Sequence, residues 1–71
     1  MDVVTAEMSA TVWKLMVADG DRVAAGDVIA VLESMKMEIP VDAPASGTVH
    51  FLAEEGAEIA EGGAIAEITR S

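Results

Sequence analysis

The sequence predicts a small all-β domain, a sandwich or barrel built from two similar units. Its length predicts a single domain over residues 1–71, whose core must be thin because a short chain buries a smaller share of its surface. A glycine-containing pattern occurs twice along the chain, and short runs of apolar and β-branched residues alternate with turn residues throughout. Several short strands with frequent turns are typical of a small sandwich or barrel.

The repeat relates the two halves of the chain. Residues 20–30 align with residues 56–66 at a constant offset of 36. The clearest aligned pairs are Gly20 with Gly56, Gly26 with Gly62, Val23 with Ile59, and Ile29 with Ile65. Thr11-Val12 aligns with Thr48-Val49 at an offset of 37, so one residue has been lost before Gly56 or gained before Gly20, and a β-bulge can absorb it. Two such copies predict two β-units packed with pseudo-two-fold symmetry.

Strands are predicted wherever β-branched or apolar residues cluster between turn residues. These segments are 3–5, 11–17, 28–32, 37–41, 48–52 and 64–69. A helix over residues 23–37 is the competing prediction, because that segment is rich in good helix formers. Gly26 interrupts it, however, and its copy at residues 65–68 is too short to form a stable helix.

The charge of the chain restricts its partners. The formal net charge is −9, and the basic residues, Lys14, Arg22, Lys36 and Arg70, are scattered. Nucleic acids and anionic membranes are bound by clustered Lys and Arg, so neither is expected as a partner. A strong net charge also discourages self-association, so we expect a monomer in isolation. Since no targeting segment or membrane-length apolar run is visible, we expect a cytoplasmic protein.

Few residues suit catalysis. The chain has no cysteine and one histidine, His50, so no nucleophile–base pair or metal site is predicted. Trp13 is expected in the core or at the end of the barrel, given its apolar neighbours. Glu54, Glu55 and Glu58 are expected to form a solvated acidic rim. We therefore expect no enzymatic activity from the domain itself.

Lys36 lies at the boundary between the two copies. If a two-fold axis relates the copies, we expect their connection near that axis at one end of the domain, with residues 33–38 forming a hairpin. Met35 and Met37 flank the lysine, where a turn usually holds Gly, Asn, Asp or Ser. Flexible thioethers suit an adaptable recognition surface, but methionines also fill gaps, so they could instead cover the end of the barrel.

The segment Glu33-Ser34-Met35-Lys36-Met37-Glu38 resembles the biotinylation motif of biotinyl domains, whose core is Met-Lys-Met. Three further segments match the same family: Thr11-Val12-Trp13-Lys14 ahead of Gly20-Asp21, Ala25-Gly26-Asp27 before the apolar strand, and Ala43-Pro44-Ala45-Ser46-Gly47-Thr48-Val49 after the motif. From about Thr5 to Ile68 the chain is similar to freestanding biotin/lipoyl attachment proteins and to biotin carboxyl carrier domains.

The resemblance implies a barrel-sandwich hybrid, a flattened barrel of two four-stranded antiparallel sheets with Lys36 on the central hairpin turn. It implies that a biotin protein ligase attaches biotin covalently to Lys36 and recognises the surrounding residues, Glu33, Ser34, Met35, Met37 and Glu38. The biotin would then carry carboxylate from a biotin carboxylase site to a carboxyltransferase site. On this interpretation the protein is a cofactor carrier and a ligase substrate, not a catalyst.

Two alternatives remain open. A lipoyl carrier shares the fold and the central lysine, but lipoyl domains usually have Asp-Lys-Ala in place of Met-Lys-Met. An unmodified interaction module would instead use the acidic surface to bind a basic partner. The variant Lys36→Arg separates these, because it abolishes a carrier function and spares charge-driven binding. Lys14, the other lysine, is expected to stay unmodified because it lies in a strand away from the tip.

Overall fold

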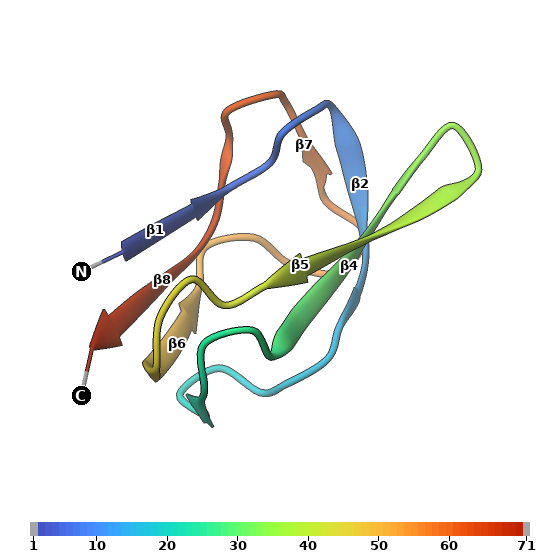
Figure 1. Cartoon of the computed structure of the whole chain (residues 1–71). Coiled ribbons are helices and arrows are strands. Elements are labelled where there is room, and N and C mark those ends of the chain that lie inside the picture. Colours follow the sequence, from blue (N-terminus) through green and yellow to red (C-terminus); the bar gives the residue numbers. More distant parts are fainter. Residues whose placement is uncertain (1, 71) are drawn as a thin grey trace.

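The computed structural model describes residues 2–70, and these form two four-stranded antiparallel sheets (Figure 1). The strands are β1 (Asp2–Thr5), β2 (Ala10–Leu15), β3 (Arg22–Val23), β4 (Val28–Ser34), β5 (Met37–Asp42), β6 (Gly47–Phe51), β7 (Glu58–Ile59) and β8 (Ala64–Arg70). One sheet has the order β1-β8-β6-β3 and the other β5-β4-β2-β7. The predicted all-β class is confirmed, and the competing helix over residues 23–37 is excluded because β4 occupies most of that segment.

The sequence pattern located the six longer strands and missed the two short ones. β2 ends two residues earlier than predicted, at Leu15, and β4 continues two residues further, to Ser34. β3 and β7 have two residues each, which is too short to show an alternating pattern. They form because β6 and β2 hold them as edge strands.

The two sheets are related by the sequence repeat. The offset of 36 to 37 residues makes β1, β2, β3 and β4 equivalent to β5, β6, β7 and β8. When each strand is replaced by its equivalent, the strand order of one sheet becomes that of the other. Each unit's turn also hydrogen-bonds to the other unit's strand. The amide of Gly20 donates to the carbonyl of Val49 at 2.7 Å, and the amide of Gly56 donates to the carbonyl of Val12 at 2.7 Å. The predicted pseudo-two-fold arrangement is therefore present, and it interlocks the units.

Trp13 accounts for the one-residue difference between the copies. The pairing of β2 with β4 shifts between Val12 and Lys14, whereas β6 pairs with β8 without a shift. The additional residue is therefore a β-bulge in β2. The expectation that Trp13 is a core residue is wrong: its side chain is 51% exposed, because it follows the inward-facing Val12 and strand alternation directs it outward.

The core lies between the two sheets and is entirely apolar. Its largest fully buried side chains are Val12, Ile29, Val49, Ile65 and Ile68. Four of these are repeat equivalents, Val12 with Val49 and Ile29 with Ile65, so both units supply the same positions. Within the described residues no buried side chain is polar or charged. The stability of the domain therefore depends on apolar burial across the interface between the units.

The β4–β5 hairpin lies far from the two-fold axis, and the expectation that it lies near the axis is wrong. The two-fold symmetry superposes β4 on β8 and β5 on β1. The hairpin that joins β4 to β5 is therefore equivalent to the C-terminal end of β8 and the N-terminal end of β1. The hairpin and the chain termini accordingly project from opposite ends of the molecule (Figure 1). The longest dimension is 35 Å, against 19 and 18 Å for the others.

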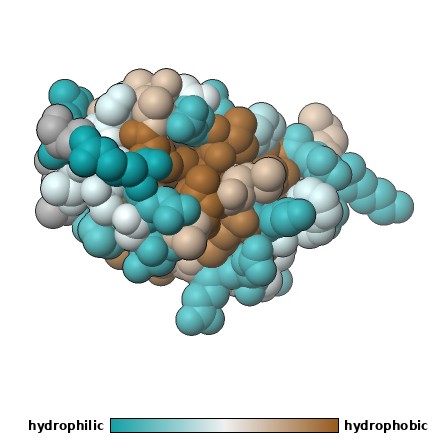
Figure 2. Space-filling model, turned by 90° about the horizontal axis from the view of Figure 1, so that it is seen from below, coloured by the Kyte–Doolittle hydropathy of each residue, from teal (hydrophilic) through white to brown (hydrophobic). Residues whose placement is uncertain are grey.

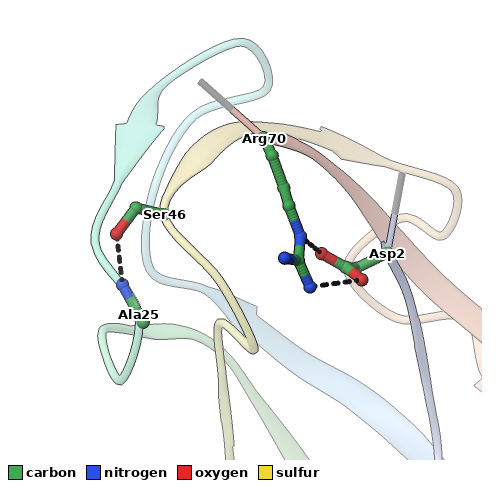
Figure 3. Close-up of polar contacts among 4 residues, drawn as sticks. All are labelled: Asp2, Ala25, Ser46 and Arg70. Carbon is green, nitrogen blue, oxygen red and sulfur yellow. Dashed lines mark hydrogen bonds and ion pairs between the residues drawn. The ribbon is translucent and has the colours of Figure 1, made fainter.

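Side-chain contacts close the end opposite the hairpin (Figure 3). Arg70 donates two hydrogen bonds to the Asp2 carboxylate, from Nε at 2.7 Å and from Nη2 at 3.2 Å. The hydroxyl of Ser46 accepts the amide of Ala25 at 3.1 Å and links two connections that are distant in sequence. No helix in residues 2–70 has the length and apolar character needed to cross a membrane.

Gly47 generates a first prediction about stability. A Cβ at this position would overlap the carbonyl oxygen of Thr69 in β8, so Gly47→Ala forces backbone displacement. We expect a loss of about 1–3 kcal/mol in the free energy of unfolding, measured by urea denaturation. The matched control is Ala10→Gly at the equivalent position of the first unit, which should cost about 0.5–1 kcal/mol. Equal losses for the two variants would contradict the close approach at Gly47.

The Asp2–Arg70 pair generates a prediction about pH. The hydrogen bond from the Arg70 guanidinium lowers the pKa of Asp2 below its usual value of 3.8. A lowered pKa in the folded state stabilises the protein above pH 3.8, and this contribution disappears as the pH falls through the folded-state pKa. Asp2→Asn should therefore lower the melting temperature slightly at neutral pH, and the difference from the wild type should vanish as the pH falls through the lowered pKa of Asp2 in the folded state.

The pair is exposed, so the difference should also shrink as salt is added. Asp42→Asn is the control, because Asp42 forms no ion pair within residues 2–70. A difference between Asp2→Asn and the wild type that persists unchanged in acid would show that the ion pair is not its cause.

Candidate functional site

The β4–β5 hairpin closes through a two-residue turn, Met35-Lys36. Both residues have positive φ angles, 52° for Met35 and 65° for Lys36. Two positive φ angles are characteristic of a type I′ turn, which normally contains Asn-Gly or a similar pair. Each non-glycine residue in this left-handed conformation costs about 1–2 kcal/mol. The tip is thus held in a conformation that its own residues disfavour, as is common at functional sites.

The side chains at the tip are directed into solvent. Met35 is 93% exposed and Met37 is 65% exposed. The alternative in which the methionines cover the end of the barrel is therefore wrong, since neither side chain is packed against it. Lys36 is exposed, and the one ion pair within residues 2–70 is Arg70–Asp2, so the Lys36 amine is not held by a carboxylate. In Figure 2, seen from below, the hairpin extends beyond the body at the right.

A row of carboxylates lies directly behind the tip. Glu33 of β4 is the cross-strand neighbour of Glu38 of β5, and Thr11 of β2 lies between Glu33 and Glu58 of β7. All three glutamates are exposed on the outer face of the sheet. Directly opposed like charges destabilise a strand pair. This row, Glu38-Glu33-Thr11-Glu58, is named the glutamate row below.

Ser34 has a contact that sequence reasoning missed. Its hydroxyl donates to the carbonyl oxygen of Ser9 at 3.0 Å, which ties the base of the hairpin to the β1–β2 connection. The local sequence does not predict this hydrogen bond, because the two residues are 25 positions apart. Ser34 therefore supports the hairpin, while Lys36 and the two methionines project from it.

Two loop carboxylates also have structural roles that the sequence did not reveal. Asp19 accepts the amide of Phe51 at 2.7 Å, and Glu55 accepts the amide of Leu15 at 2.9 Å. These are equivalent bonds in the two units, each crossing from one unit to the other. Glu55 is therefore more than part of a solvated rim.

His50 does not belong to the site. It is exposed on β6, where it faces Glu67 of β8 across the strand pair. Among residues 2–70, no three His, Asp or Glu side chains converge in a way that could hold a metal ion. The chemistry available at the hairpin is that of one accessible amine between two thioethers.

Comparison with known proteins places these features in a family. The family model described as biotin-requiring enzyme matches residues 2–68. The chain is 41% identical to the biotin/lipoyl attachment protein of Bacillus subtilis over 69 residues, covering 96% of this chain and 94% of that protein. It is 50% identical over 68 residues to the biotin-dependent acyl-coenzyme A carboxylase alpha3 subunit of Mycobacterium leprae, covering 94% of this chain but only 11% of that subunit.

Solved structures give the same result for the fold. The urea carboxylase of Kluyveromyces lactis superposes with a TM-score of 0.88 and 35% identity, over 96% of this chain and 6% of that one. A single-chain, multi-domain long-chain acyl-CoA carboxylase superposes with a TM-score of 0.88 and 28% identity, over 99% of this chain and 7% of that one.

The fold and the hairpin thus define a carrier module rather than a catalytic domain. The chain belongs to the biotin-requiring enzyme family, which agrees with the resemblance found in its sequence.

The strained turn generates a prediction. Replacing it by Asn-Gly, with Met35→Asn and Lys36→Gly together, should raise the free energy of unfolding by about 1–2 kcal/mol, because these residues accept positive φ. For a domain of this size each kcal/mol corresponds to about 4–8 °C in melting temperature. Met37→Ala is the control: Met37 lies outside the turn and is exposed, so its replacement should change little. A turn variant no more stable than the wild type would contradict the strain.

Proposed function

We propose that Lys36 is the covalent attachment site for biotin and that the loaded domain carries carboxylate between the two active sites of a biotin-dependent carboxylase. The observation that carries the proposal is the strained, exposed Met35-Lys36 turn at the centre of the Met-Lys-Met motif. The family match and the biotinyl relatives support biotin as the cofactor.

The attachment chemistry divides between the domain and a ligase. A lysine amine is protonated and weakly nucleophilic at neutral pH. A biotin protein ligase supplies biotinyl-adenylate: Lys36 Nζ loses a proton and attacks the carboxyl carbon. A C–N amide bond forms while the bond to AMP breaks. The domain contributes exposure and a fixed position, because β4 and β5 hold the amine at the end of the long axis. Met35, Met37, Glu33, Ser34 and Glu38 are the residues that the ligase would contact around it.

The shape of the molecule suits a shuttle between two active sites. The hairpin projects from one end, so a carboxylase site can enclose the tip without displacing the body (Figure 1). The chain matches nearly the whole B. subtilis attachment protein but about a tenth of the M. leprae carboxylase subunit. A biotin carboxylase and a carboxyltransferase are accordingly the proposed partners, and the cytoplasm, where ATP and biotin ligase are available, is the proposed compartment.

The proposal is tested by incubating the purified domain with a bacterial biotin protein ligase, biotin and MgATP. Intact mass should increase by a single biotinyl group, and peptide mapping should place it on Lys36 and not on Lys14, which is held in β2. Lys36→Arg should give no adduct while melting at the same temperature.

A known biotinyl domain serves as the positive control for the ligase. If that domain is modified and this chain is not, the biotin proposal fails, and the same assay with a lipoate ligase then tests lipoylation. An adduct on Lys14 of the wild type would contradict the assignment of the site.

A further inference from the structure

Trp13 is the point at which the internal symmetry of the domain is broken. It is the single tryptophan of the chain, and the repeat provides no equivalent residue in β6. Its side chain points outward next to the buried Val12 and is 51% exposed, although an indole is among the largest apolar groups a protein can bury. The bulge keeps Lys14 on the outer face beside Trp13, and bulges are often found beside functional sites. Trp13 contributes little to the core, so its exposure needs another explanation.

The pairing of the strands places Trp13 on the same face as the glutamate row. Val12 and Leu15 face inward on either side of the bulge, so Trp13 and Lys14 both lie on the outer face. Lys14 pairs with Val31 of β4, which pairs with Pro40 of β5. Lys14, Val31 and Pro40 therefore form one cross-strand row, and Trp13 lies beside Lys14 at the bulge. The apolar members of this surface, Trp13, Val31 and Pro40, are named the apolar strip, and the glutamate row lies between this strip and the hairpin tip.

The corresponding face of the other sheet lacks this combination. On that sheet, one cross-strand row consists of Val3, Glu67 and His50, the equivalents of Pro40, Val31 and Lys14. A second row consists of Thr69, Thr48 and Arg22, the equivalents of Glu33, Thr11 and Glu58. There the position of Glu58 is occupied by Arg22, and that of Glu33 by Thr69. An exposed indole beside a row of carboxylates thus occurs only on the outer face of the sheet that carries the Lys36 hairpin.

The strip is rigidly connected to the attachment site. Val31 and Met35 are four residues apart along one continuous strand and its turn, which corresponds to about 13 Å. A protein that binds the strip therefore fixes the position of the tip. This matters most when the reacting atom is Lys36 Nζ itself, because a nucleophile must be brought within about 3–3.5 Å of its target. After biotin is attached, the reacting ring lies at the end of a long flexible arm, and the orientation of the domain matters less.

We propose that Trp13, Val31 and Pro40 are the docking surface for the ligase that joins biotin to Lys36. The complementary ligase surface has an apolar pocket for the indole and Lys or Arg side chains opposite the glutamate row, since the chain carries a net charge of −9. This inference rests on the proposed function and deepens it, because it makes Trp13 of β2 a recognition residue outside the hairpin that carries Lys36.

The first test measures biotinylation kinetics with a bacterial biotin protein ligase. Trp13→Ala should raise KM for the domain at least about tenfold and leave kcat within about twofold, because the contact is lost equally from the ground and transition states. Trp13→Phe should retain most of the affinity. Val3→Ala is the matched control: Val3 is exposed to 52%, on the outer face of the other sheet, and its replacement should leave KM unchanged. Added salt should raise KM of the wild type.

A second measurement is independent of turnover. With 5-fluorotryptophan at position 13 of the Lys36→Arg variant, the single fluorine resonance should shift or broaden when the ligase is added. Perturbed backbone amides at residues 33–38 together with an unchanged fluorine signal would overturn the docking surface and leave the proposed function intact. An unchanged KM for Trp13→Ala would do the same. Failure of the wild type to be biotinylated at all would overturn both.

Discussion

The fold depends on contacts between its two units, because each unit buries the apolar side of its strands against the other unit. The turn amides of Gly20 and Gly56 each donate to the carbonyl of a buried valine in the other unit. Val12 and Val49 are fully buried at these crossings. Packing and backbone hydrogen bonding therefore join the units at the same places, so a thin core is formed from both halves at once.

Because the core formed by the two units stabilises the domain, the β4–β5 hairpin can adopt a conformation that its own residues disfavour. The Met35-Lys36 turn holds two non-glycine residues at positive φ, Glu33 opposes Glu38, and both methionines face solvent. Each feature opposes stability, and none contributes to the core. Their concentration in six consecutive residues agrees with the proposed role of this segment in presenting Lys36, because functional sites are where local rules are expected to fail.

The symmetry of the backbone also relates two ends of the molecule that differ in structure. The two-fold relation maps the hairpin onto the chain termini, so one end closes with the Arg70–Asp2 pair and the other presents Lys36. The side chains depart from the symmetry mainly on the sheet with the hairpin, through Trp13 and the glutamate row. Similar backbones thus carry unequal surfaces, and the surface nearest Lys36 is the acidic and aromatic one.

The sequence by itself determined the all-β class, the two units, the six longer strands and Lys36 at the centre of the chain. These follow from local turn chemistry and from residues whose spacing is visible along the chain. Only the tertiary structure decided where β3 and β7 pair, that the additional residue is Trp13, that the hairpin lies away from the axis, and that Ser34 bonds to Ser9. Each of these depends on contacts between distant segments, and two-residue strands, bulges and long-range hydrogen bonds leave no period in the sequence from which to predict them.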